Sequence, residues 1–188
     1  MDTPLYKRDP QAWQQHLAEG NAHQARKRVG ADVVLLDDDS RILIVQPNYK
    51  PGWDLPGGMI EANEPPLEGL RRELAEELDL HLVKFQLLCI DWVPPHGPWD
   101  DQLAFIFDGG VLSALEQERL TLHDNELLDF RFVEPAELSE LLRPRLLRRV
   151  QMALEVLHAS GNVQYLHDGK PLVEERSRAH SVDDQKQL

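Results

Sequence analysis

The stretch from Leu67 to Leu80 most constrains the fold, because its leucines and glutamates recur with the period of an α-helix. At about 100° per residue, one arc of such a helix carries leucines and the neighbouring arc carries glutamates. The leucines are Leu67, Leu70, Leu74 and Leu78, and the glutamates are Glu73, Glu76 and Glu77. We therefore expect a helix that buries its apolar stripe and presents carboxylates at the edge of the core.

These carboxylates need a positive partner that the sequence supplies only in part. Glu73 and Glu77 lie one helical turn apart, and such a like-charge pair destabilises an isolated helix. Arg72 can pair with Glu76, but one guanidinium cannot neutralise the whole cluster. Hard oxygen ligands clustered in this way suit Mg²⁺ or Mn²⁺. The alternative is a solvated acidic helix face.

The spacing around this helix resembles the Nudix box, G-x5-E-x7-R-E-U-x-E-E-x-G-U, where U is an aliphatic residue. The matching residues are Gly58, Glu64, Arg72, Glu73, Leu74, Glu76, Glu77 and Leu80. Asp79 stands where the family has glycine, just past the helix end, where a left-handed residue is usual. Because aspartate tolerates that conformation better than most residues, we interpret the departure as a small cost in stability and not as loss of activity.

The resemblance covers about residues 28–160 and implies an α/β/α sandwich with a mixed sheet. The order of a strand pair, a helix, several strands and a last helix favours the same α/β class. We expect residues 1–27 to form an extension with an accessory helix, and residues 161–188 a second extension. Its end, from Val173 onward, is polar and aperiodic, so we expect disorder there.

The resemblance also implies an activity and roles for the box residues. Nudix enzymes hydrolyse a phosphoanhydride bond in a nucleoside diphosphate linked to another group. By position in the box, Glu76 and Glu77 would bind Mg²⁺ or Mn²⁺, and Glu73 would be a ligand or the general base. Arg72 would orient the cluster. Glu64 would tie the loop to it or reach the metal through water.

Two residues outside the helix complete the implied metal site. The family often uses the carbonyl before the box, which is that of Gly57, and a glutamate at the start of a later strand, which is Glu126 here. Glu126 also competes for the role of general base. The alternative interpretation is that Glu126 is an exposed glutamate in a polar loop.

The substrate is less constrained than the chemistry. Pro95 lies 15 residues after Leu80, a spacing that resembles Nudix enzymes acting on ADP-ribose. Trp53 and Trp99 would stack on a base, or else pack within the protein. The alternatives are a nucleoside triphosphate or pathway-specific diphosphate as substrate, or a domain that senses a nucleotide without cutting it.

Composition limits the partners. The net charge of −13 argues against a nucleic acid polymer or an anionic membrane, but a bound metal still permits a small phosphorylated substrate. The single Cys89 lies in an apolar run and indicates a buried thiol in a reducing compartment. Without a signal peptide or a membrane span, the expected location is cytoplasmic. The N-terminal helix packs on the domain or supports a homodimer.

The remaining elements follow from periodicity and turn residues. We expect Gly109 and Gly110 to end the strand before them. We also expect the arginines of the last helix to face outward rather than bind phosphate. The expected elements are helices over 10–27, 135–142 and 143–159, and strands over 31–36, 41–46, 82–93, 103–107 and 127–133.

Overall fold

The computed structural model describes residues 3–123, 126–159 and 161–172. The strands are β1 (Arg28–Leu36), β2 (Ile42–Pro47), β3 (Gly57–Met59), β4 (Gln86–Val93), β5 (Gln102–Val111), β6 (Leu127–Val133), β7 (Gln164–His167) and β8 (Lys170–Pro171). The helices are α1 (Leu5–Arg8), α2 (Pro10–Ala22), α3 (Pro66–Leu78), α4 (Ala114–Arg119), α5 (Leu138–Leu141) and α6 (Pro144–Ala159), with a short 3₁₀ helix η1 (Pro135–Glu137) before α5.

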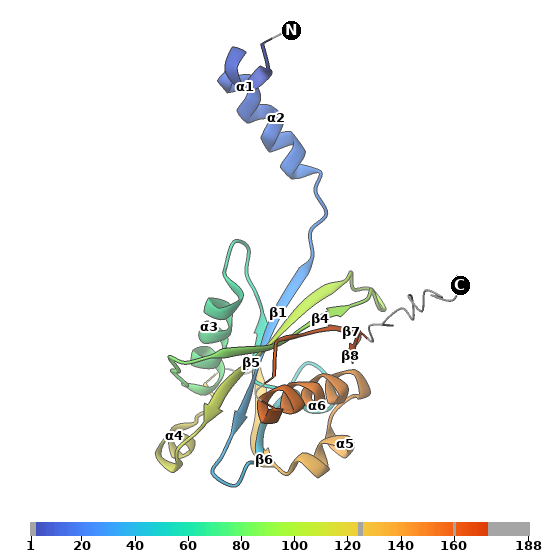
Figure 1. Cartoon of the computed structure of the whole chain (residues 1–188). Coiled ribbons are helices and arrows are strands. Elements are labelled where there is room, and N and C mark those ends of the chain that lie inside the picture. The colour runs from blue at the N-terminus through green and yellow to red at the C-terminus, as the bar shows by residue number, and fades with distance from the viewer. Residues whose placement is uncertain (1–2, 124–125, 160, 173–188) are drawn as a thin grey trace, which may run out of the picture.

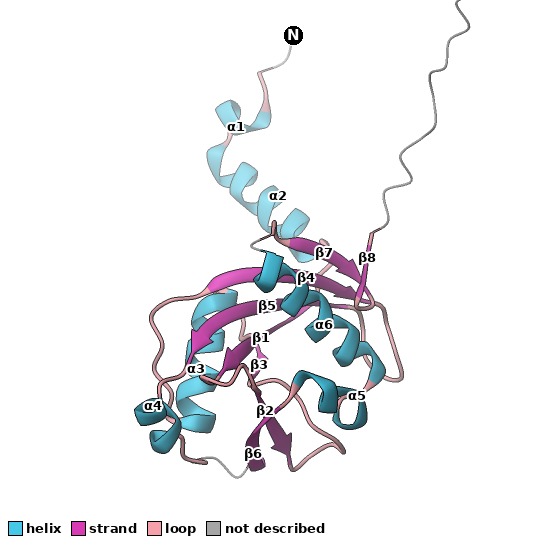
Figure 2. Ribbon diagram, turned by 60° about the horizontal axis from the view of Figure 1, so that its bottom comes forward, coloured by secondary structure: helices cyan, strands magenta, loops and turns pink. Residues whose placement is uncertain are grey.

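Within the described residues, the strands form one mixed eight-stranded sheet in the order β6-β2-β1-β5-β4-β7-β8, and β3 pairs with β1 outside this path (Figure 1). β1 pairs in parallel with β5 and antiparallel with β2 and β3. Helix α3 lies on one face of the sheet, and α5 and α6 lie on the other (Figure 2). The predicted α/β/α sandwich is confirmed.

Strand β1 contributes to both halves of the core because its side chains alternate between the two faces of the sheet. Val34 and Leu36 pack with the residues of α6, whereas Val33 and Leu35 pack with those of α3. A strand covered on both faces needs consecutive apolar residues, and β1 supplies them. Asp32 precedes this run on the α6 side and is the first polar residue of the site described below.

Helix α3 forms as the leucine pattern predicts. Leu70, Leu74 and Leu78 are fully buried, and Pro66 occupies the first turn, where its missing N–H costs nothing. The helix ends at Asp79, whose φ of 53° and ψ of 33° are left-handed, as expected for this position. Packing of the leucines fixes the rotation of the helix and therefore the direction of its glutamates.

The other strand predictions are confirmed in part. β1 and β2 form the expected antiparallel pair, and β6 covers the expected residues 127–133. The strand expected over 82–93 begins only at Gln86, and its pairing with β5 shifts register between Leu87 and Cys89. Cys89 is buried and free, as predicted.

Two expectations about local structure are wrong. Gly109 and Gly110 lie inside β5 and do not end it. Gly110 pairs with Leu35 just after a register shift, so the two glycines form a β-bulge. The parallel pairing of β1 with β5 continues beyond this bulge. Helix α4, a short helix that Ser113 and Glu116 stabilise through a capping box, was not predicted from the sequence.

The N-terminal helices lie apart from the sandwich. The helix expected over 10–27 ends at Ala22, and α1 and α2 project away from the sheet in Figure 1. Neither α1 nor α2 has a buried residue. Among the described residues, no helix is long and apolar enough to span a membrane. The disorder expected from Val173 onward lies outside the described residues.

Candidate active site

Arg72 links the acidic residues of α3 to the loop that precedes it. Its guanidinium donates to Glu64 Oε1 at 3.0 Å, to Glu73 Oε1 at 3.0 Å and to Glu76 Oε2 at 3.1 Å. A further bond, of 3.2 Å, reaches the carbonyl of Met59 at the end of β3. The planar guanidinium therefore fixes three carboxylates and one strand relative to each other.

Glu77 differs from its neighbours because its side chain is enclosed. The residue is 5 % exposed, and its Oε2 atom has no hydrogen-bond partner among the described residues. Burial and the nearby charges of Glu73, Glu126 and Asp32 together raise the pKa of this carboxyl to about 8, although a backbone hydrogen bond from Gly57 opposes the rise. A buried carboxylate oxygen without a donor is costly, and a cation would satisfy it.

The two glycines of β3 bring this strand close to the carboxylates. Gly57 has a φ of 130°, and a Cβ there would lie 2.2 Å from the carbonyl oxygen of Ala31 in β1. A Cβ at Gly58 would lie 2.5 Å from the carboxyl carbon of Glu73. Burial also raises the pKa of Glu73, and Arg72 opposes the rise. Side chains at these two positions would push the strand away from both β1 and α3.

The donor set suits a hard cation. In the described part of the chain, no three carboxylate, histidine or thiol groups already converge as a complete ligand set. The charges of Glu73, Glu126 and Asp32 are nevertheless close enough to Glu77 to raise its pKa, and its Oε2 atom has no hydrogen-bond partner among the described residues. Oxygen donors without sulfur or imidazole fit Mg²⁺ or Mn²⁺.

A cleft of about 910 Å³ opens beside Glu77. Of the residues predicted for the site, Gly57, Glu77 and Trp99 line it. Trp99 is 55 % exposed, and the guanidinium carbon of Arg28 lies 4.5 Å from its ring centroid. Trp53 is placed differently: its ring packs against the core under the guanidinium of Arg131, whose carbon lies 4.2 Å from the ring centroid.

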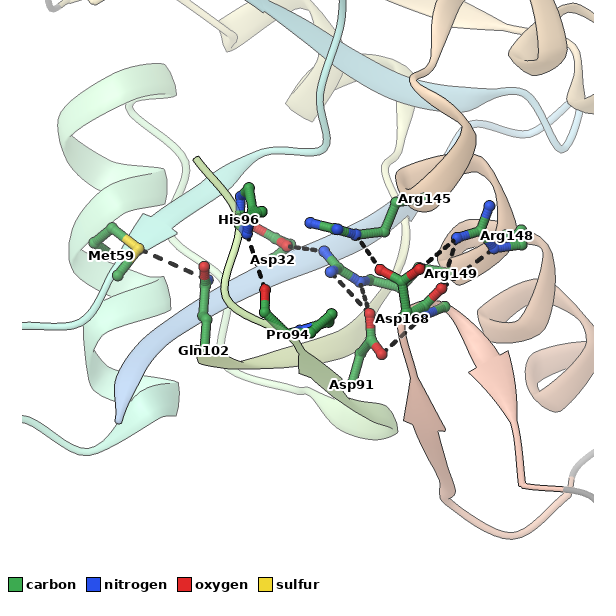
Figure 3. Close-up of polar contacts among 11 residues, drawn as sticks. Asp32, Met59, Asp91, Pro94, His96, Gln102, Arg145, Arg148, Arg149 and Asp168 are labelled. Carbon is green, nitrogen blue, oxygen red and sulfur yellow. Dashed lines mark hydrogen bonds and ion pairs between the residues drawn. The ribbon is translucent and has the colours of Figure 1, made fainter. Parts of the chain in front are cut away.

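The cleft also contains a buried ion-pair network that sequence reasoning missed. Arg149 of α6 donates to Asp91 Oδ2 at 2.9 and 3.0 Å, and its Nη1 atom lies 3.7 Å from Asp32 Oδ2 (Figure 3). Burial and the charge of Asp54 raise the pKa of Asp32 to about 7, and Arg149 opposes the rise. The network joins β1, β4 and α6 across one face of the sheet.

The expectation that the arginines of the last helix face outward is wrong for Arg149, which is 8 % exposed. A signal was present in the sequence. Arg149 lies one turn after Leu146 and one turn before Ala153, so it falls within the apolar stripe of α6. The buried Asp91 compensates the charge that this position places in the core.

Comparison with known proteins defines the class. The family model for the NUDIX domain matches residues 26–153, and the chain belongs to this family. It is 42 % identical over 53 residues to an RNA pyrophosphohydrolase from Halorhodospira halophila, an alignment that covers 28 % of this chain and 29 % of the relative. It is 42 % identical over 48 residues to a putative 8-oxo-dGTP diphosphatase from Bacillus subtilis, covering 26 % and 32 %.

A solved structure supports the fold. The NUDIX domain of NrtR from Shewanella oneidensis, solved in complex with ADP ribose, has a TM-score of 0.62 and 21 % sequence identity. The alignment covers 77 % of this chain and 97 % of that domain. The chain spans about a third of the length of the two sequence relatives, whereas it matches nearly all of the NrtR domain. Nudix hydrolases generally use divalent metal ions.

Proposed function

We propose that this protein is a metal-dependent hydrolase that cuts a phosphoanhydride bond in a nucleoside diphosphate linked to another group. The observation that carries the proposal is the unpartnered, buried Oε2 of Glu77 at the wall of a cleft of about 910 Å³. A site that pairs an enclosed carboxylate with a substrate-sized cleft suits a cation shared between protein and diphosphate.

The site contains residues that would bind the metal and a residue, Arg72, that positions these ligands. Glu76, Glu77, Glu73, Glu126 and the carbonyl of Gly57 would hold Mg²⁺ or Mn²⁺, which supplies charge neutralisation on the diphosphate and a more acidic bound water. Arg72 fixes the side chains of Glu64, Glu73 and Glu76 relative to one another by donating a hydrogen bond to each carboxylate. The enclosed position of Glu77 keeps competing water away from that oxygen.

Glu73 and Glu126 are the candidates for the general base. Burial raises the pKa of Glu73, which moves this carboxyl toward the range in which a base both accepts and releases a proton. Glu126 is exposed at the start of β6, and its backbone carbonyl accepts from the amide of Asn48 at 2.8 Å. That bond holds the chain near Glu126 against the loop after β2, on the cleft side.

An ADP-ribose-like substrate is the first choice. The cleft volume of about 910 Å³ lies near the upper end of small-molecule sites, which suits a nucleoside with a second group attached. Trp99 offers an exposed ring at the cleft for a base, and the NrtR domain of similar fold was solved with ADP ribose. The second candidate is a nucleoside triphosphate, which the name of the Bacillus subtilis relative favours.

Product analysis tests the proposal. The purified protein is incubated with Mg²⁺ or Mn²⁺ and a panel of ADP-ribose, other nucleoside diphosphate conjugates and triphosphates. We expect AMP and ribose phosphate from ADP-ribose, and turnover lowered by orders of magnitude in Glu76→Gln. Glu68→Gln, an exposed carboxylate on the same helix, is the matched control and should keep its turnover. Pyrophosphate from one triphosphate would select the second candidate, and a panel left uncut would contradict the hydrolase.

We also propose a homodimer, because α2 forms a complete helix with no buried residue in the single chain. Helices of this length gain most of their stability from packing. Light scattering should give the mass of a dimer, and a monomeric mass would contradict this proposal.

A further inference from the structure

The cleft wall formed by α6 and the turn between β7 and β8 carries more positive than negative charge, although the chain as a whole has a net charge of −13. On this wall, Arg145 and Arg148 share one carboxylate, that of Asp168 (Figure 3). All three side chains line the cleft. Two guanidinium groups against one carboxylate leave one positive charge without a counter-charge at this point.

The hydrogen bonds leave donors available to a ligand. Arg145 donates to Asp168 Oδ1 through Nε. Arg148 donates to the carbonyl oxygen of Asp168 through Nε at 3.2 Å and through Nη2 at 2.7 Å, and its Nη2 also donates to Asp168 Oδ2 at 3.2 Å. Within the described residues, the terminal nitrogens of Arg145 contact no carboxylate, and its side chain is 31 % exposed. A guanidinium carries five N–H donors in a fixed plane, so both terminal nitrogens of Arg145 and the Nη1 of Arg148 remain available to a ligand.

The turn that carries Asp168 is anchored to strand β4. Asp168 and Gly169 connect β7 and β8, and the amide of Gly169 donates to Asp91 Oδ1 at 2.9 Å. A Cβ at Gly169 would lie 2.8 Å from the carbonyl oxygen of Arg145, so the turn presses against α6. The same Asp91 holds Arg149, and the turn lies beyond residue 153, where the family match ends.

We propose that Arg145 and Arg148, positioned by Asp168, form a subsite for a phosphate group of the substrate other than the diphosphate that is cut. The inference rests on the proposed function and narrows the substrate to a nucleoside diphosphate conjugate that carries a further phosphate monoester. Guanidinium groups bind phosphate oxygens in bidentate fashion, and a rigidly held pair loses little entropy on binding. Asp168 is a positioning residue that fixes both arginines and leaves the excess charge for the ligand.

The first test measures binding of inorganic phosphate to the metal-free protein by NMR titration, without any catalytic readout. We expect binding by the wild type and loss of at least about tenfold in affinity in the double variant Arg145→Gln, Arg148→Gln, because charge-assisted hydrogen bonds are lost. The double variant Arg71→Gln, Arg119→Gln removes two charges outside the cleft and should bind as the wild type does. Equal binding by both double variants, or none by the wild type, would overturn the subsite.

The variant Asp168→Asn distinguishes two roles for Arg145 and Arg148: binding an anion, or only holding the turn at Asp168 in place. Asparagine tolerates the left-handed φ of 57° at this position and keeps the backbone carbonyl that Arg148 contacts, while it removes the competing negative charge. We expect phosphate to bind more tightly to this variant. Weaker phosphate binding by a variant that melts as the wild type does would overturn the role given to Asp168.

The second test concerns the substrate class. Coenzyme A and dephospho-coenzyme A differ by one phosphate monoester, as do NADP⁺ and NAD⁺. For a pair that is hydrolysed, we expect a lower KM for the phosphorylated member in the wild type. This difference in KM should disappear in the arginine double variant. Equal KM values within each pair would overturn the substrate class. Phosphate binding without any hydrolysis would leave the subsite standing and refute the proposed hydrolase instead.

Discussion

Replacing Glu77 by glutamine should stabilise the metal-free protein while it removes the response to metal. The carboxyl of Glu77 is 5 % exposed and its Oε2 atom lacks a donor among the described residues. Burial, with the charge of Glu73 next in size, raises its pKa from 4.5 to about 8. Such a group costs stability whenever it is ionised without a cation.

The sign follows from proton linkage. Between pH 4.5 and about 8, folded Glu77 keeps a proton that the unfolded chain releases, so stability falls as the pH rises. At about 1.4 kcal/mol per pKa unit, the loss reaches a ceiling of about 5 kcal/mol above pH 8. Glutamine has no such loss. With about 2–4 °C per kcal/mol for a chain of this size, the variant should melt up to about 10–20 °C higher at pH 9 and equally at pH 4.5.

Circular dichroism melts in EDTA from pH 4.5 to 9 measure this difference. Glu76→Gln is the matched control, since the side chain of Glu76 is 53 % exposed and its charge is solvated. Adding Mg²⁺ or Mn²⁺ should raise the melting temperature of the wild type and leave that of Glu77→Gln unchanged. Parallel pH curves for wild type and Glu77→Gln, or a variant that melts lower at every pH, would refute the reasoning.

Two further substitutions test the frame of the site. Asp79→Gly restores glycine at a residue with a φ of 53° and should raise the free energy of unfolding by about 0.5–1 kcal/mol, measured in urea; a lower midpoint would contradict the strain inferred there. Asp91→Ala leaves Arg149 buried without its closest carboxylate and removes the acceptor of the Gly169 amide, so stability should fall by about 3–5 kcal/mol. A loss below about 1 kcal/mol would show that the network is not a structural element.

Local patterns in the sequence were sufficient for the elements that depend on neighbouring residues. The leucine spacing of α3 predicted both the helix and its buried face, and the left-handed residue Asp79 followed from the helix end. The antiparallel pair of β1 and β2 followed from two apolar runs around a turn. The bulge at Gly109 and Gly110 was misjudged because the same glycines that end a strand also permit a bulge inside one.

The polar network across α6 depends on residues far apart in the chain, which is why periodicity alone did not predict it. Arg149 and Asp91 are 58 residues apart, and Asp91 and Gly169 are 78 apart. Asp91 lies within a run that also suits a fully apolar strand, and its partner becomes evident only once β4 lies under α6. Only the position of Arg149 in the apolar stripe of its helix hinted that this charge was buried.

The distribution of charge in the cleft links stability to the proposed activity. Glu77 and Asp32 are carboxylates that burial makes costly to ionise, and both line the cleft. Arg145 and Arg148, on the wall formed by α6, share a single counter-charge. Each wall is therefore incompletely compensated in the protein alone, the first lacking a cation and the second an anion. In the proposed function, a metal ion carried with a phosphorylated substrate would satisfy both walls together, because the metal would supply the charge for one and the additional phosphate would supply it for the other.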